Sequence, residues 1–183
     1  MLIARELQNK NRAEYLLYMW QVEDIIRSYG ADIDKLNENY LSQFGVDEAQ
    51  MQELRTWYAD LCNMMREEGK MEKGHLQICN NVIIGLEDVH EQLLASTKFP
   101  YYRNMYHTVL PYIVELRAMS GASASNVGEI EHCFEVLYGI VLLRLQQKDI
   151  SAETQQAAQH ISQFLGQLSD YYFKQKEGTL ELD

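Results

Sequence analysis

The sequence predicts an all-α protein, a compact bundle or array of about seven helices, and three observations support this fold class. Apolar residues recur at spacings of three and four along most of the chain, which is the repeat of a helix with a buried face. Only two prolines and ten glycines occur among 183 residues, so little of the chain is suited to turns. No long stretch alternates apolar and polar residues as a half-buried strand would.

Start and stop signals divide the chain into helices. The first four helices are expected over about residues 2–29, over a short segment ending at Phe44, and over residues 47–69 and 75–95. A fifth helix follows the breaker Ser96–Pro100, a sixth covers residues 129–147, and a seventh runs from Ser151 to about residue 176. The residues suited to cap them are Asp32 or Asp34, Asp47 with Gln50 in a capping box, and Ser151. Pro111 lies inside the fifth helix, where the loss of one backbone hydrogen bond predicts a kink.

Two of these helices are apolar on more than one side. The first carries two apolar stripes between Tyr15 and Tyr29, and the sixth contains the uninterrupted run Val136–Leu143, which is expected to be buried. A chain of this size has only one or two central positions that can bury a helix on all sides. We therefore expect a second copy of the chain to cover part of one of these helices, in a homodimer.

The chain is expected to form a single helical domain over residues 1–183. The small residues of Ser120–Gly128 indicate a flexible loop, because too little sequence follows them to build a separate core. The tail after about residue 176 is expected to fray.

Composition narrows the class of function. The formal net charge is −11 and the isoelectric point is near 4.9, which opposes binding to nucleic acid or to an anionic membrane surface. No apolar run is long enough for a signal peptide or a membrane span, so a cytoplasmic protein is expected. The three cysteines, Cys62, Cys79 and Cys133, are widely spaced among apolar residues and are expected to be reduced and buried.

Four phrases of the sequence are distinctive. They are Ala13–Arg27 (AEYLLYMWQVEDIIR), Phe99–Tyr102 (FPYY), Pro111–Arg117 (PYIVELR) and Leu137–Gln146 (LYGIVLLRLQ). With them the chain resembles domain of unknown function family 4924, a set of Bacteroidetes proteins near this length. The resemblance implies a bacterial cytoplasmic protein, and it brings no activity, cofactor or catalytic residue.

A doubled Glu-x-x-His pattern is the sharpest candidate for chemistry. Residues three apart share a helix face, and di-iron bundles combine two such pairs with single glutamates from two other helices. The candidate ligands are Glu87, His90, Glu129 and His132, with Glu23 and Glu115. Because glutamate is common here and the two pairs occupy opposite ends of their helices, the sequence favours no metal and keeps this set as the alternative.

An aromatic belt surrounds Pro111 and is the candidate ligand-binding region. It consists of Tyr101, Tyr102, Arg103, Tyr106, His107 and Tyr112. Rings with hydroxyl groups beside a freed backbone carbonyl are typical of a pocket for a flat or weakly anionic small molecule. The alternative is that these tyrosines only pack in the core.

No nucleophile elbow, phosphate-binding glycine loop or dinucleotide fingerprint occurs in the sequence, and no cofactor is expected. The sequence therefore favours a non-enzymatic helical binding or interaction protein, with a second copy or another protein as partner. The alternative from another class is a metal-dependent carboxylate-histidine enzyme.

Overall fold

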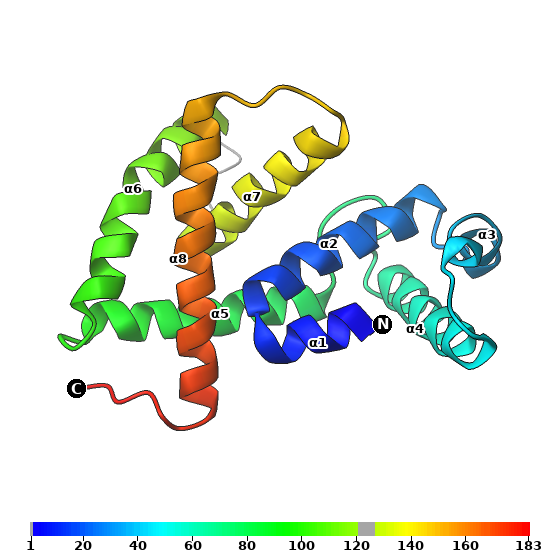
Figure 1. Cartoon of the computed structure of the whole chain (residues 1–183), viewed down its shortest axis with the longest axis horizontal. Coiled ribbons are helices and arrows are strands. Elements are labelled where there is room, and N and C mark those ends of the chain that lie inside the picture. Colours follow the sequence, from blue (N-terminus) through cyan, green and yellow to red (C-terminus); the bar gives the residue numbers. More distant parts are fainter. Residues whose placement is uncertain (1, 121–126) are drawn as a thin grey trace. The chain divides into compact units, whose positions relative to one another are not determined.

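The computed structural model describes residues 2–120 and 127–183 and confirms the all-α prediction (Figure 1). These described residues form eight α-helices and one short 3₁₀ helix, with no strand. The helices are α1 Leu2–Lys10, α2 Arg12–Ser28, α3 Ile33–Asn39, η1 Leu41–Gln43, α4 Glu48–Glu67, α5 Gln77–Ala95, α6 Pro100–Ser120, α7 Glu129–Leu145 and α8 Ala152–Lys176. Most of the predicted loop Ser120–Gly128, from residue 121 to 126, lies outside the described residues.

The first predicted helix is two helices, because the chain is interrupted at Asn11. The side-chain oxygen of Asn11 accepts hydrogen bonds from the backbone N–H groups of Ala13 and Glu14, at 3.0 and 3.1 Å. A side chain that accepts from the first turn in this way begins a new helix. This extra start accounts for eight α-helices where about seven were expected.

The predicted caps are present. Asp32 accepts from the N–H groups of Asp34 and Lys35, Asp47 and Gln50 form the reciprocal capping box, and Ser151 accepts from the N–H of Thr154. The short second helix ends earlier than expected, at Asn39, and the 3₁₀ helix η1 continues to Gln43. Helix α6 runs through Pro111 without ending there.

The chain divides into two compact units. Unit 1 contains Met1–Lys10 and Tyr18–Asn81, and unit 2 contains Asn11–Leu17 and Val82–Asp183. The sequence-based expectation of one domain stays a prediction.

In unit 1, α3 packs against α4 and η1, and η1 also contacts α4. Its core residues include Trp20, Leu36, Leu41, Tyr58 and Met65, all fully buried or nearly so.

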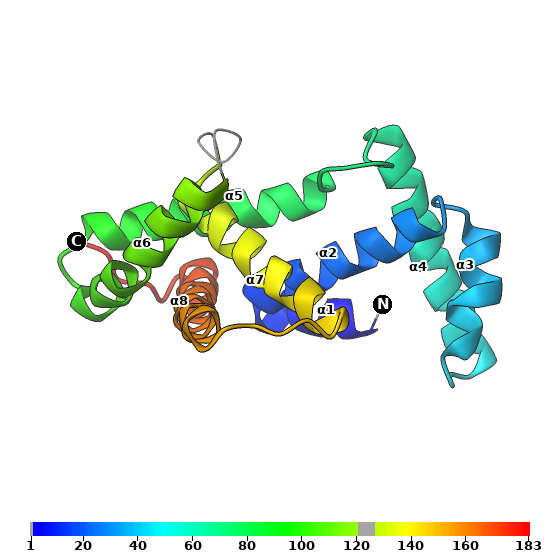
Figure 2. The same ribbon diagram turned by 90° about the horizontal axis from the view of Figure 1, so that it is seen from above.

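In unit 2, α8 contacts both α6 and α7, and α6 contacts α7 (Figure 2). The core between these three helices contains Tyr102, Ile113, Phe134, Phe164 and Leu165. The tail beyond α8 returns to unit 2, where the Asp183 carboxylate accepts hydrogen bonds from the side chains of Ser96 and Thr97 at 3.2 and 2.8 Å.

Candidate functional site

The predicted aromatic belt lies on α6, and two of its members belong to the aromatic core of unit 2. Tyr102 is fully buried, with its hydroxyl 2.7 Å from Nδ1 of His90 and its ring stacked on Phe164. The Tyr106 hydroxyl donates to the Glu129 carboxylate at 2.7 Å. Burial, with this hydrogen bond, raises the pKa of Tyr106 to about 12. These two rings are therefore neutral packing groups at neutral pH.

The other four members of the belt face different surroundings. Arg103 donates to the backbone carbonyls of Leu94 and Ser96, at 3.3 and 2.6 Å, so it satisfies acceptors at the end of α5. The other three are Tyr101, which is 64% exposed, His107, which is exposed, and Tyr112, which lines the groove described below. A ligand site beside Pro111 stays a prediction.

The carboxylate-histidine pairs have other neighbours. The Glu87 carboxylate lies against Gly128 at the start of α7, where a Cβ on the glycine would collide with the carboxylate oxygen. Burial, together with the nearby Glu131, raises the pKa of Glu87. His132 is buried; its Nδ1 lies 3.1 Å from the Glu135 carboxylate, and its Nε2 has no hydrogen-bond partner within the described part of the chain.

The other two candidate metal ligands, Glu23 and Glu115, have different surroundings from the two Glu-x-x-His pairs. Glu115 lines the groove of unit 2, and Glu23 belongs to a network in unit 1. Across residues 2–120 and 127–183, no group of three or more His, Cys, Asp or Glu side chains is arranged to hold a metal ion. The choice between a metal site and none stays a prediction.

A buried carboxylate network in unit 1 was not anticipated from the sequence. Glu23 is fully buried in α2; it accepts from the N–H of Leu76 at 2.9 Å and from the Cys79 thiol at 3.3 Å, and lies 2.7 Å from His75 Nδ1. The His75 ring stacks on Trp20, with 4.0 Å between ring centroids. Burial and the nearby Glu23 carboxylate raise the pKa of Cys79, which keeps it a thiol. This network holds the segment before α5 against α2 and has the character of a structural element.

One hollow of unit 2 is an apolar groove beside the second half of α7. Its volume is about 640 Å³. It is lined by Tyr112, Glu115 and Leu116 of α6, by Glu135, Val136, Gly139, Ile140, Leu142 and Leu143 of α7 with Gln146 beyond it, and by Glu153, Thr154 and Ala157 of α8. Most of its apolar lining residues are aliphatic, and three glutamates, Glu115, Glu135 and Glu153, also line it. This is the candidate interaction site, which we call the α7 groove.

The apolar run of α7 is only partly covered. Within Val136–Leu143, Leu137 and Ile140 are buried, whereas the other aliphatic side chains are half-buried, and the following Leu145 is 68% exposed. The sequence-based expectation of a buried run is therefore only partly met. Gly139 lies at the middle of this surface, and apart from the neighbouring backbone of α7 no atom of the described residues lies within 4 Å of the place where its Cβ would be.

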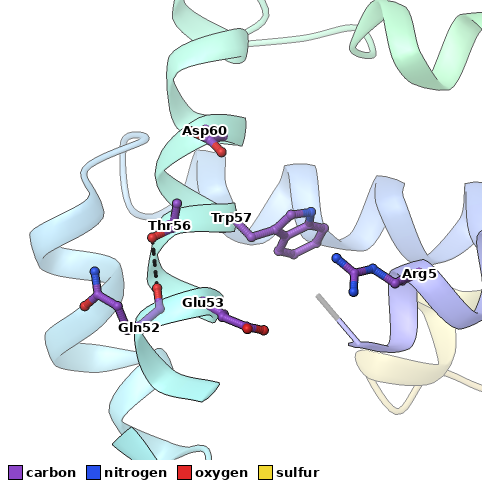
Figure 3. Close-up of a pocket in the computed structure, with 6 residues that line it drawn as sticks. All are labelled: Arg5, Gln52, Glu53, Thr56, Trp57 and Asp60. Atoms are coloured by element: carbon purple, nitrogen blue, oxygen red, sulfur yellow. Dashed lines mark hydrogen bonds between the residues drawn. The ribbon is translucent and has the colours of Figure 1, made fainter. Parts of the chain in front are cut away.

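Unit 1 contains two neighbouring pockets against α4. An apolar pocket of about 170 Å³ is lined by Ile3, Tyr18, Phe44, Val46, Gln50, Glu53, Leu54 and Tyr58. A polar pocket of about 360 Å³ is lined by Arg5, Gln52, Glu53, Thr56, Trp57 and Asp60 (Figure 3). Both pockets lie between residues of α1 and α4, and Glu53 lines both. Sequence periodicity did not reveal them, because their residues come from four separate segments.

The described residues define an all-α fold. The chain belongs to the family described as Domain of unknown function (DUF4924), whose sequence profile matches residues 1–179. This confirms the resemblance that the sequence phrases indicated. Comparisons with curated proteins and with solved structures gave no match.

Proposed function

We propose that this protein is a non-enzymatic interaction protein whose partner is a second copy of the same chain, bound through the α7 groove. The observation that carries the proposal is the half-exposed aliphatic surface of α7 with Gly139 at its centre. A helix with apolar residues on several sides is stable in water only when other elements cover those sides. Large exposed apolar patches on a protein typically mark interaction sites.

Gly139 supports a close helix crossing. A glycine in a helix interior is less favourable than alanine by about 1 kcal/mol. Gly85, in α5, has a reason within the chain, because a Cβ there would meet the Tyr172 ring at 3.2 Å. Gly139 has no such neighbour. The absent side chain would let a second helix approach α7 at this point.

Charge favours an antiparallel pairing of the two α7 helices. The first half of α7 carries Glu129, Glu131 and Glu135, whereas Arg144 lies near its end and Lys148 follows it. When two antiparallel copies cross at Gly139, Arg144 of one copy comes near Glu135 of the other. Opposite charges at both ends of the contact would fix this orientation.

The cellular setting is part of the proposal. No helix within the described residues is long and apolar enough to cross a membrane. We infer a bacterial cytoplasmic location from the family resemblance and from the sequence, and the net charge of −11 argues against a nucleic-acid partner. A different protein with an apolar helix would compete for the same groove.

The test compares Gly139→Ala with the matched variant Gly166→Ala in sedimentation velocity, at protein concentrations from about 1 to about 100 µM. Gly166 is also inside a helix and also has no atom within 4 Å of its Cβ position. Both variants should stabilise the monomer by about 1 kcal/mol through helix propensity. Only Gly139→Ala should weaken self-association, by about tenfold or more, because its methyl group lies in the crossing.

A wild-type protein that stays monomeric over this range contradicts the proposal. Equal self-association of the two variants contradicts the assigned crossing point.

A further inference from the structure

The two pockets of unit 1 present complementary surfaces side by side. Three of the large hydrophobic side chains that are exposed to solvent, Ile3, Phe44 and Val46, all line the apolar pocket. They come from α1 and from the segment between η1 and α4. Exposed apolar residues scattered singly need no explanation, but a group around one hollow is typical of a binding site.

The apolar pocket has the size of one aromatic ring or one branched alkyl group. Its volume is about 170 Å³, and a dry cavity of about 150 Å³ binds benzene in another protein. Burial raises the pKa of both Tyr18 and Tyr58, so their rings are neutral walls at neutral pH. An apolar group of that size would cover Phe44 and Val46.

The polar pocket carries both signs of charge. Arg5 lies on α1, and Glu53 and Asp60 lie on α4. In Figure 3 the Arg5 guanidinium extends towards the Trp57 ring, and the Glu53 side chain points into the same space. None of the three charged side chains makes a hydrogen bond or an ion pair with another described residue. The Thr56 hydroxyl, in contrast, is used within α4, where it donates to the Gln52 carbonyl at 2.9 Å.

We propose that the two pockets form one site for a free α-amino acid with a bulky apolar side chain. Glu53, which lines both pockets, would receive the α-ammonium group at the junction. The carboxylate would then reach Arg5, since guanidinium groups bind carboxylates through paired hydrogen bonds. The side chain would enter the apolar pocket.

Other ligand classes fit the charges less well. A fatty acid would satisfy Arg5 but would bring its negative charge beside Glu53 and Asp60. An alkylamine would bring a counter-charge to Glu53 and leave the Arg5 guanidinium without one. A zwitterion with an apolar group brings a counter-charge to both Arg5 and Glu53, whereas Asp60 lies two helical turns from Glu53 and is exposed to solvent.

The test titrates the full chain with L-phenylalanine and detects binding by two-dimensional NMR of the tryptophan indole N–H signals. The chain has two tryptophans, so Trp20 serves as an internal control because it is buried and stacked on His75 outside both pockets. We expect the Trp57 signal to shift with a dissociation constant on the order of 1 mM or tighter, while the Trp20 signal stays in place. Phenethylamine lacks the carboxylate, N-acetyl-phenylalanine lacks the ammonium group, and glycine lacks the side chain; each should bind at least about fivefold more weakly.

Two variants test the charged contacts. Arg5→Gln should remove the preference for phenylalanine over phenethylamine, and Glu53→Gln should remove the preference over N-acetyl-phenylalanine. Glu67→Gln is the matched control, because Glu67 is exposed on the same helix and lines neither pocket. It should leave binding unchanged.

Three results would overturn the proposal. They are an unmoved Trp57 signal with phenylalanine up to about 10 mM, equal binding of phenylalanine and its truncated analogues, and unchanged ligand preferences in both variants. The α7 groove is not part of this experiment, so its failure leaves the proposed self-association standing.

Discussion

Helices α2 and α7 carry the same sequence signal and have different surroundings. Both helices are apolar on more than one side, so every apolar side was expected to be covered by other helices of the chain or by a second copy. In α2 the side chains of Leu16, Met19 and Ile26 are at most 1% exposed. In α7 the second half stays half-buried and ends at Leu145, which is 68% exposed. Apolar periodicity therefore predicts which face of a helix needs a partner, but not whether the same chain supplies it.

Single residues that are unusual inside a helix also have neighbours that explain them in α2 but not in α7. The one fully buried carboxylate of α2, Glu23, is matched by donors from His75, Leu76 and Cys79. In α7, Gly139 has no neighbour that explains its missing side chain. The chain itself accounts for the buried face of α2, whereas it leaves the glycine and the exposed end of α7 unexplained.

Truncation of a buried leucine in α2 should change stability far more than truncation of an exposed leucine in α7. Leu16→Ala should lower the free energy of unfolding by about 3 kcal/mol, because it opens a cavity at a fully buried position. Leu145→Ala should change it by less than about 0.5 kcal/mol when the protein is dilute enough to be monomeric. Urea denaturation at low protein concentration measures both variants. Similar losses would show that burial does not distinguish α2 from the second half of α7.

A smaller change in stability should come from His90 of α5, which lies near the start of α7. The His90 ring is buried against Tyr102 and Tyr106 of α6 and Phe164 of α8. The Glu129 carboxylate of α7 also acts on it electrostatically. Burial lowers the pKa of His90 below its ordinary value of 6.5, although Glu129 opposes this shift. The unfolded chain thus binds the proton more readily than the folded one.

The free energy of unfolding should therefore fall as pH is lowered below 7, towards the folded-state pKa of His90. His90→Asn keeps a neutral polar group and does not titrate in this range. Its unfolding free energy should depend less steeply on pH between 7 and 5 than that of the wild type. Urea titrations at several pH values measure the two slopes, and equal slopes would remove His90 as the cause.

Local signals made most of the fold predictable. Capping residues such as Asp32, Asp47 and Ser151 act on the first turn of their own helices, so sequence spacing was sufficient to identify them. Asn11 was missed because it lies in the polar stretch of residues 8–12, where no apolar repeat is present to show an interruption, so the first helix was extended through it. The resulting break divides one expected helix into α1 and α2.

The candidate sites were less predictable, because they depend on contacts between distant segments. Residue spacing places Tyr102 on the apolar stripe of α6 and Tyr101 at its flank, in agreement with exposures of 0% and 64%. The spacing did not reveal the partners of Tyr102, His90 and Phe164, because they lie on other helices. A glutamate among apolar residues could have indicated the buried Glu23, but its donors lie about fifty residues later. The paired pockets of unit 1 require α1 and α4 to meet, which no local pattern encodes.

Amide hydrogen exchange at two protein concentrations, about 1 and about 100 µM, tests self-association through the α7 groove most directly. We predict that peptides covering residues 136–145 exchange more slowly at the higher concentration, because a second copy covers the α7 groove. Peptides covering residues 18–28 of α2 should exchange at the same rate in both samples, since the inward-facing side chains Met19, Val22 and Ile26 are already buried within the chain. Exchange in residues 136–145 that does not depend on concentration would contradict self-association through the α7 groove.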